Sequence, residues 1–181
     1  IWTVHNLVNH EQRRVMLESF VNRFVASLSG ALIVHSVSAC KMVAAKCSGR
    51  TARKISVIYH GHYINWYPNK IEKREARNAL ELPQTDLVFL FLGIIRPYKG
   101  VLELIDTFKQ CELTDSKLMI VGQPTKGMTD RIVLDHIGQS GQIRFTSGYL
   151  PDDQIQLYMN ACDVVMLPYR ESLTSGAAVL A

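Results

Sequence analysis

The sequence predicts an α/β protein with two parallel-sheet units, the first incomplete and the second truncated at its carboxyl end. Two observations lead to this fold class. Short apolar strands alternate with amphipathic helices along the 181 residues, and glycine follows several of the strands. Alternating strands and helices are typical of parallel sheets with helical crossovers. The composition, 48% hydrophobic and 20% charged, is that of an ordinary globular core.

The first unit is predicted over residues 1–64. Residues 1–4 have the pattern of a strand, and His5 follows them. Asn9 is expected to cap a helix with a broad apolar face. Residues 31–35 and 55–59 are predicted as two further strands. Because residue 1 falls inside a strand pattern and the chain stops inside an apolar helix, we expect an internal fragment of a longer protein.

A second α/β run is predicted after a connection at residues 65–85, which holds a charged helix at 72–80. Residues 86–181 then form the second unit. Each of its strands leads through a short loop into a helix, as expected for a parallel sheet. The predicted strands are 87–92, 117–121, 142–145 and 163–167.

The organising stretch of this second unit is an apolar strand at 86–92 that runs into a basic loop. Its residues suit a strand buried on both faces. Gly93 allows a sharp turn, Arg96 and Lys99 supply two cations, and Gly100 opens an amphipathic helix. A helix N-terminus beside two cations attracts anions. The alternative, a solvated basic loop without a ligand, stays open on this stretch alone.

Four strand-to-helix loops of the second unit contain a glycine, and in a parallel sheet all such loops meet at the carboxyl edge, where ligands bind. Two of these loops add groups suited to phosphate, namely Arg96 with Lys99 and Thr174 with Ser175. Together they indicate a nucleotide or phosphorylated ligand. Neither a GxGxxG motif nor a P-loop lysine motif is present. The four glycines are Gly93, Gly122, Gly148 and Gly176.

Net charge and cysteine content indicate the kind of ligand and the cellular compartment. The net charge of +4 and the pI of about 8.9 favour an anionic substrate or membrane surface, and no basic–aromatic cluster indicates nucleic-acid binding. The four cysteines lack metal-like spacing. They predict buried thiols in a reducing compartment. We therefore expect a cytoplasmic location, which leaves open a peripheral contact at the inner face of the plasma membrane.

In the order and spacing of its motifs, the chain resembles the retaining GT-B glycosyltransferases of group 1, which are built from two Rossmann-like domains. Residues 1–64 resemble the end of the acceptor-side domain, and residues 86–181 resemble the nucleotide-sugar donor domain. The resemblance covers essentially the whole chain. Its motifs lie at residues 3–6, 57–63, 92–100, 119–122, 147–151, 163–168 and 171–176.

This resemblance implies transfer of a sugar from a GDP- or UDP-sugar to a glycan or lipid-linked acceptor, with retention, in bacterial polysaccharide or glycoconjugate synthesis. It implies no metal ion and no cofactor. His5 would be the catalytic residue, orienting the donor sugar or the reacting groups. The donor-binding residues would be Gly93, Arg96, Lys99, Gly122, Tyr149, Leu150, Glu171, Thr174, Ser175 and Gly176.

Two positions depart from the family pattern. The arginine that usually follows the loop glycine is replaced by Ile94, so Arg96 would have to take its role. Glu171 lies near the first position of the family's pair of glutamates, but the second position falls near Val179, so no carboxylate is available for the nucleotide ribose. The donor base and sugar stay open.

Other functions remain open from the sequence. The missing second glutamate also suits a sugar-nucleotide-binding module without catalysis. An epimerase or phosphorylase on the same fold is a third hypothesis, although no cofactor lysine site of a phosphorylase is found. His60 and His62 are interpreted as hinge or packing residues.

Overall fold

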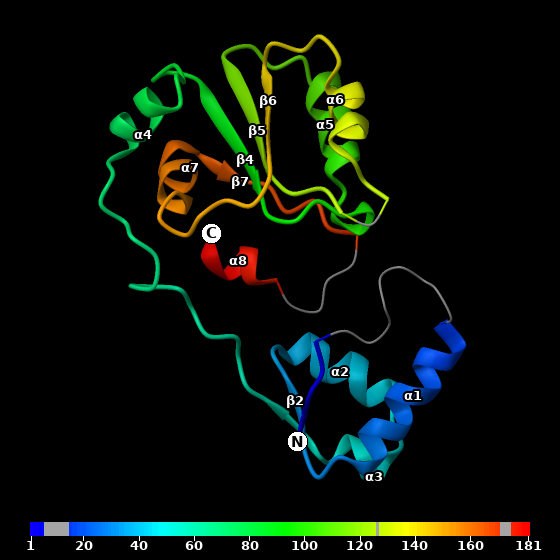
Figure 1. Cartoon of the computed structure of the whole chain (residues 1–181). Coiled ribbons are helices and arrows are strands. Elements are labelled where there is room, and N and C mark those ends of the chain that lie inside the picture. The colour runs from blue at the N-terminus through cyan, green and yellow to red at the C-terminus, as the bar shows by residue number, and fades with distance from the viewer. Residues whose placement is uncertain (6–14, 126, 171–174) are drawn as a thin grey trace. The chain divides into compact units, whose positions relative to one another are not determined.

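The computed structural model describes residues 1–5, 15–125, 127–170 and 175–181. By their internal contacts, these residues divide into two compact units (Figure 1). The smaller unit contains residues 1–62 and most of the last helix. The larger unit contains Tyr63–Arg170 and the last two residues.

The larger unit is built on a four-stranded sheet with the order β6-β5-β4-β7, and all of its strand pairs are parallel. This arrangement confirms the parallel α/β sheet expected from the sequence. The strands are β4 (Leu87–Leu92), β5 (Ser116–Gly122), β6 (Ile143–Ser147) and β7 (Val164–Val165).

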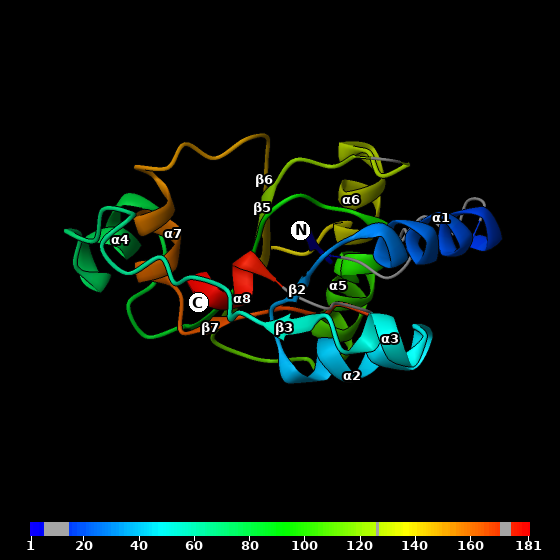
Figure 2. The ribbon, with the colours of Figure 1, turned by 90° about the horizontal axis from the view of Figure 1, so that it is seen from below.

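Helices cover both faces of this sheet. Figures 1 and 2 show α5 and α6 on one face and α4 and α7 on the other. The strands β4, β5 and β6 follow one another in one direction, and β7 then returns to the other side of β4. Because the direction reverses, right-handed crossovers place helices on both faces. The helices are α4 (Lys73–Ala79), α5 (Val101–Gln110), α6 (Asp130–Ile137) and α7 (Ile155–Ala161), and a 3₁₀ turn, η1 (Pro97–Lys99), precedes α5.

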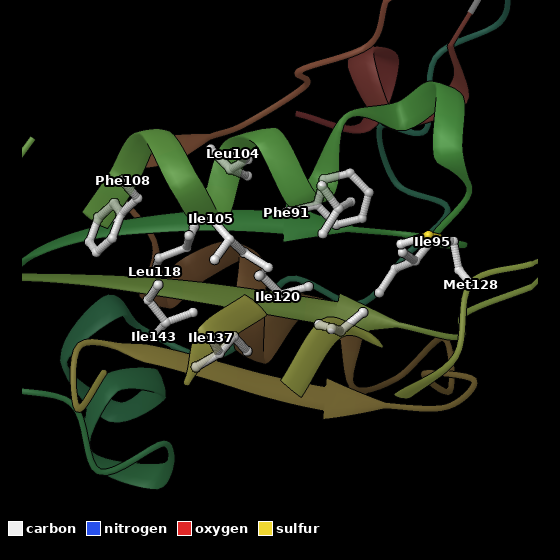
Figure 3. Close-up of a cluster of buried hydrophobic side chains, with 12 residues drawn as sticks. Phe91, Ile95, Leu104, Ile105, Phe108, Leu118, Ile120, Met128, Ile137 and Ile143 are labelled. Carbon is white, nitrogen blue, oxygen red and sulfur yellow. The ribbon is translucent and has the colours of Figure 1, made fainter. Parts of the chain in front are cut away.

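Strand β4 supplies side chains to two hydrophobic cores because successive residues of a strand point to opposite faces. Phe91 packs with Ile105, Leu118 and other residues below α5 and α6 (Figure 3). Leu90 lies in the second core with residues of α4 and α7. Strand β4 is apolar along its length because both of its faces are buried.

Strand β7 is shorter than the predicted range of 163–167. Its ladder pairs only Val164 and Val165 with β4, although the amides of Asp163 and Met166 also donate to β4 carbonyls, at 2.8 and 2.7 Å. Pro168, which has no amide hydrogen, follows soon after. The short β7 still fixes the loop that follows it beside β4.

The smaller unit is a three-stranded parallel sheet with the order β1-β2-β3. Its small core contains Val4, Val34, Ala39 and Val43. The predicted cap Asn9 lies outside the described residues. The elements are β1 (Trp2–Thr3), α1 (Val15–Leu28), β2 (Leu32–Val34), α2 (Val37–Lys46), α3 (Gly49–Ala52) and β3 (Ile55–Val57), with α8 (Gly176–Leu180) at the end of the chain.

The cysteines differ from the sequence expectation. All four are free thiols, but Cys111 is exposed and the others are only half-buried. Cys111 follows directly after α5, where the chain turns at the protein surface. No helix among the described residues is long and apolar enough to span a membrane.

Candidate functional site

Three of the four predicted glycines meet at the carboxyl edge of the larger sheet. The amide of Gly93 donates to Val121 at 2.9 Å, and the amide of Gly148 donates to Gly122 at 3.3 Å. Gly122 has a φ of 149°, and a Cβ placed there would lie 2.0 Å from the carbonyl oxygen of Gly93. Only glycine permits such close backbone contact. The carboxyl ends of β4, β5 and β6 thus form one compact edge.

The loops after β4 and β7 are fastened to each other at the same edge. Gly100, with a φ of 68°, lies so close to Pro168 that a Cβ would stand 2.2 Å from the proline carbonyl oxygen. The amide of Arg170 donates to Tyr98 at 3.0 Å, and its guanidinium pairs with Glu103 in the first turn of α5. These contacts fix the η1 turn, which ends at Lys99 and directly follows Arg96.

The cations Arg96 and Lys99 are half-buried beside the first glycine. The Lys99 ammonium lies 3.4 Å from where a Cβ on Gly93 would be, and 5.3 Å from the ring centroid of Tyr169. Burial, and then the positive charge of Arg96, lower the pKa of Lys99 below its ordinary value. Within the described ranges, no carboxylate forms an ion pair with either cation.

Two buried polar atoms at this edge add to the unused hydrogen-bonding capacity. Among the residues that the structure describes, Arg96 Nε and Thr125 Oγ1 are buried without a hydrogen-bond partner. Thr125 reaches the site because its amide donates to Ile95 at 3.0 Å, where Ile95 and Pro124 continue the pairing of β4 with β5. Sequence reasoning missed Thr125. Its position directly after Gly122-Gln123-Pro124 was the available signal.

Tyr149 and Leu150 follow Gly148 but face different surroundings. The Tyr149 side chain is 78% exposed, and its hydroxyl donates to Asp152 Oδ1 at 3.4 Å. Leu150 packs against the core on the α4 and α7 face. The Leu150 side chain is thus partly occupied by the core, whereas Tyr149 presents an exposed aromatic face.

The other four predicted donor-binding residues are not part of this edge among the residues that the structure describes. Glu171 and Thr174 lie outside the described residues. Ser175 and Gly176 are grouped with the smaller unit, where the Ser175 hydroxyl accepts from the amide of Ala178 at 3.2 Å at the start of α8.

A row of three histidines lies at the carboxyl edge of the smaller sheet. His5 follows β1, His35 follows β2, and His60 comes soon after β3. Ring centroids are 5.5 Å apart for His5 and His35, and 5.6 Å apart for His35 and His60. Only His5 was predicted as a site residue. The parallel order of the three strands is the signal that would have joined the other two to it.

The comparison with protein families identifies the chain. The description of the family Glycosyl transferases group 1 matches residues 72–177, which is more than half of the chain and includes the whole edge from Gly93 to Tyr169. The chain belongs to this family. The group 1 membership expected from the sequence is thereby confirmed, whereas retention and the expectation of a fragment stay predictions.

Curated relatives agree with this assignment. The chain is 28% identical over 179 residues to GDP-mannose:glycolipid 4-beta-D-mannosyltransferase of Xanthomonas campestris pv. campestris, covering 99% of this chain and 46% of the relative. It is 28% identical over 148 residues to lipopolysaccharide 1,2-N-acetylglucosaminetransferase of Salmonella typhimurium, covering 72% of this chain and 39% of the relative. The chain thus spans less than half the length of these relatives.

Solved structures share the fold. Sucrose-phosphate synthase of Thermosynechococcus elongatus matches with a TM-score of 0.76 at 16% identity, over 97% of this chain and 46% of that one. Anabaena HepE, in complex with UDP and glucose, matches with a TM-score of 0.70 at 23% identity, over 90% of this chain and 44% of that one. These likenesses confirm the predicted α/β fold of GT-B glycosyltransferases.

Proposed function

We propose that the parent protein of this chain is a hexosyltransferase that moves a sugar from a nucleotide-diphosphate sugar to a glycan or lipid-linked acceptor, with retention and without a metal ion. Polysaccharide or glycoconjugate synthesis in a bacterial cytoplasm is the setting we infer. Membership of the family supports transferase chemistry, and the relatives named above act with GDP-mannose or on lipopolysaccharide. GDP- and UDP-sugars are both candidates for the donor.

One observation carries the proposal: the pair Arg96 and Lys99 lies at the glycine edge without a carboxylate partner among the described residues. A half-buried cation without an acid beside it is costly unless a ligand supplies negative charge. The departing nucleoside diphosphate supplies that charge. Because charge on the diphosphate grows as the glycosidic bond breaks, fixed cations there stabilise the transition state more than the bound substrate.

The remaining residues are given proposed roles. Gly93 would leave room for a phosphate beside the Lys99 ammonium, and Gly122 permits the close backbone contact with Gly93. Tyr149 with the backbone of Leu150 would face the base. Glu171 would contact hydroxyls of the donor sugar, and Thr174, Ser175 and Gly176 would add hydroxyl and amide donors to the diphosphate. His5 would orient the reacting groups near the anomeric carbon. These assignments are proposals from the family resemblance.

Titration calorimetry with GDP and with UDP tests the diphosphate site on the chain itself. Lys99→Ala should weaken binding by about 1.5–3 kcal/mol, the contribution of a hydrogen bond to a charged group. Arg96→Ala should cost a similar amount if Arg96 fills the role left by Ile94. The matched control is Lys109→Ala, because Lys109 lies in the last turn of α5 and donates to the carbonyl of His136 at 2.8 Å.

Equal affinity of Lys99→Ala and the unmodified chain would reject the diphosphate assignment. A preference for GDP over UDP, or the reverse, would name the donor base. Release of nucleoside diphosphate from a nucleotide sugar by the parent protein, in the presence of acceptor, would separate a transferase from a binding module.

The role of His5 is tested in the parent protein. His5→Ala should lower kcat by roughly 10²-fold or more, the scale for a positioned catalytic side chain, and should leave nucleoside diphosphate affinity nearly unchanged. The physical reason is that His5 would act on the reacting groups and not on the nucleotide. Turnover equal to that of the unmodified parent would reduce His5 to a histidine at a strand end.

A further inference from the structure

Three histidines are brought together at the edge of the smaller sheet by its fold. His5, His35 and His60 come from three different strands, yet the central ring lies 5.5 and 5.6 Å from its two neighbours. Since parallel strands end at one edge, the positions just after β1, β2 and β3 are brought into a row. Neither the family match, which begins at residue 72, nor the proposed role of His5 accounts for the other two rings.

The hydrogen bonds of this row orient the imidazole nitrogens. His35 Nδ1 lies 2.8 Å from the carbonyl oxygen of Ile58, and His60 Nδ1 lies 2.7 Å from that of Gly61. A carbonyl oxygen only accepts, so both Nδ1 atoms carry the proton. The Nε2 atom of His35 is thereby left as the nitrogen that gains a proton when the ring becomes a cation. Once protonated, it can donate to an anion.

The smaller unit carries an excess of positive charge, which favours an anionic ligand. Residues 1–62 contain eight lysines and arginines but only two carboxylates, Glu11 and Glu18, and they hold five of the six histidines of the chain. The helix that starts directly after His35, α2, has no acidic residue in its first turn. The His35 ring contacts the His5 and His60 rings and forms a hydrogen bond with the carbonyl of Ile58.

We propose that the edge formed by His5, His35 and His60 binds a phosphate group of the acceptor. This inference rests on the proposed function and specifies its acceptor as a phosphorylated one. The chemistry fits because imidazolium rings donate charge-assisted hydrogen bonds to phosphate oxygens. The donor diphosphate has its own proposed site on the larger unit at Arg96 and Lys99, so the histidine edge of the smaller unit is proposed for the second substrate.

The test uses proton–carbon NMR spectra of the histidine rings in the whole chain, with inorganic pyrophosphate as the probe. The Lys99→Ala background removes the proposed donor site, so that the probe reports on the histidines. Resonances of His5, His35 and His60 should shift, and that of His136 on α6 should not.

Two variants and one matched control locate the binding. His35→Asn keeps an N–H that can donate to the Ile58 carbonyl but removes the ring, and it should weaken pyrophosphate binding by about tenfold to a hundredfold. His60→Asn should weaken it as well. His136→Asn is the control: His136 Nδ1 lies 3.1 Å from the carbonyl of Ile132 within its own helix, and affinity should not change.

The source of the phosphate is distinguished by further probes. A hexose 1-phosphate and a short isoprenyl diphosphate represent a sugar phosphate and a lipid diphosphate, and the tighter of the two identifies the kind of acceptor. The free hexose should produce no shift at the three histidines.

Three results would overturn the inference: equal shifts at all six histidines, unchanged affinity in His35→Asn, or a response of the row to Zn²⁺ but not to pyrophosphate. Each differs from failure of the proposed donor site. That failure would appear as unchanged GDP and UDP binding in Lys99→Ala, whatever the histidines do.

Discussion

Basic side chains lie at both the amino edge and the carboxyl edge of the larger sheet. They differ in whether their nitrogens find hydrogen-bond partners within the protein. At the amino edge, the Arg77 side chain is only 3% exposed, and all of its nitrogens donate: Nε to Ala161 at 3.0 Å, Nη1 to Gln84 at 2.6 Å, and Nη2 to Asp163 at 2.6 Å. At the carboxyl edge, Arg96 Nε is buried without a hydrogen-bond partner among the described residues.

The carboxylates are distributed in the same unequal way. Asp163 accepts from Arg77, from Lys73 and from the amide of Val88 at 2.7 Å. Lys99, at the other edge, has no such partner among the described residues and lies over the Tyr169 ring. A fully bonded buried cation holds the fold together, whereas a cation left without an acid is available to a ligand. The two edges therefore separate stability from binding within one sheet.

The largest loss of stability is expected for a substitution at the amino edge. Arg77→Met should lower the free energy of unfolding by about 3–5 kcal/mol, because it leaves Asp163 and several buried carbonyls without their donor. Urea denaturation at neutral pH measures this loss. The matched variant at the other edge is Lys99→Met. If both variants lost the same stability, the contrast between the edges would be wrong.

An intermediate and pH-dependent effect is expected for Asp163→Asn. Burial pushes the pKa of Asp163 up, but the hydrogen bonds from Lys73 and Val88 and the charge of Arg77 outweigh it, so the pKa lies below its ordinary 3.8. The carboxylate thus stabilises the fold above its ordinary pKa, and this contribution disappears as the pH falls through the lowered value. At neutral pH the variant should lose about 1.5–3 kcal/mol.

Urea denaturation of Asp163→Asn and the unmodified chain over a pH series checks this sign. The difference in unfolding free energy should be constant near neutral pH and should shrink as the pH falls below 3.8. A difference that grew on acidification would contradict the assignment of Asp163 as an ionised partner of Arg77.

The smallest effect on stability is expected for Lys99→Met. Since burial and then the charge of Arg96 lower the pKa of Lys99, the fold binds this proton less well than the unfolded chain does. That penalty is present at neutral pH and disappears as the pH rises through the lowered pKa. The variant should therefore keep the stability of the unmodified chain within about 0.5 kcal/mol, or exceed it.

Comparing the two proteins by urea denaturation at neutral pH and near the ordinary lysine pKa of 10.5 sharpens the contrast. The unmodified chain should gain stability relative to Lys99→Met as the pH rises. A clear loss of stability in Lys99→Met at neutral pH would show that Lys99, like Arg77, is a structural cation.

The sequence by itself determined the parallel sheet of the larger unit and its glycine edge. The apolar run of β4 requires burial on both faces, and alternating strands and helices require parallel strands. Because parallel strands end at one edge, Gly93, Gly122 and Gly148 had to meet, and the structure confirms that they do. The spacing of apolar residues and the alternation of strands with helices can both be read along the chain. The sequence was therefore sufficient to predict the parallel sheet and its glycine edge.

Only the tertiary structure decided which polar groups find partners. Nothing in the sequence distinguishes Arg77, bonded to Asp163 across 86 residues, from Arg96, whose Nε has no partner in the described part of the chain. The row of histidines likewise depends on contacts between rings 30 and 25 residues apart. The physical reason is that strand register and crossover packing set such distances, and these arise only when the elements assemble.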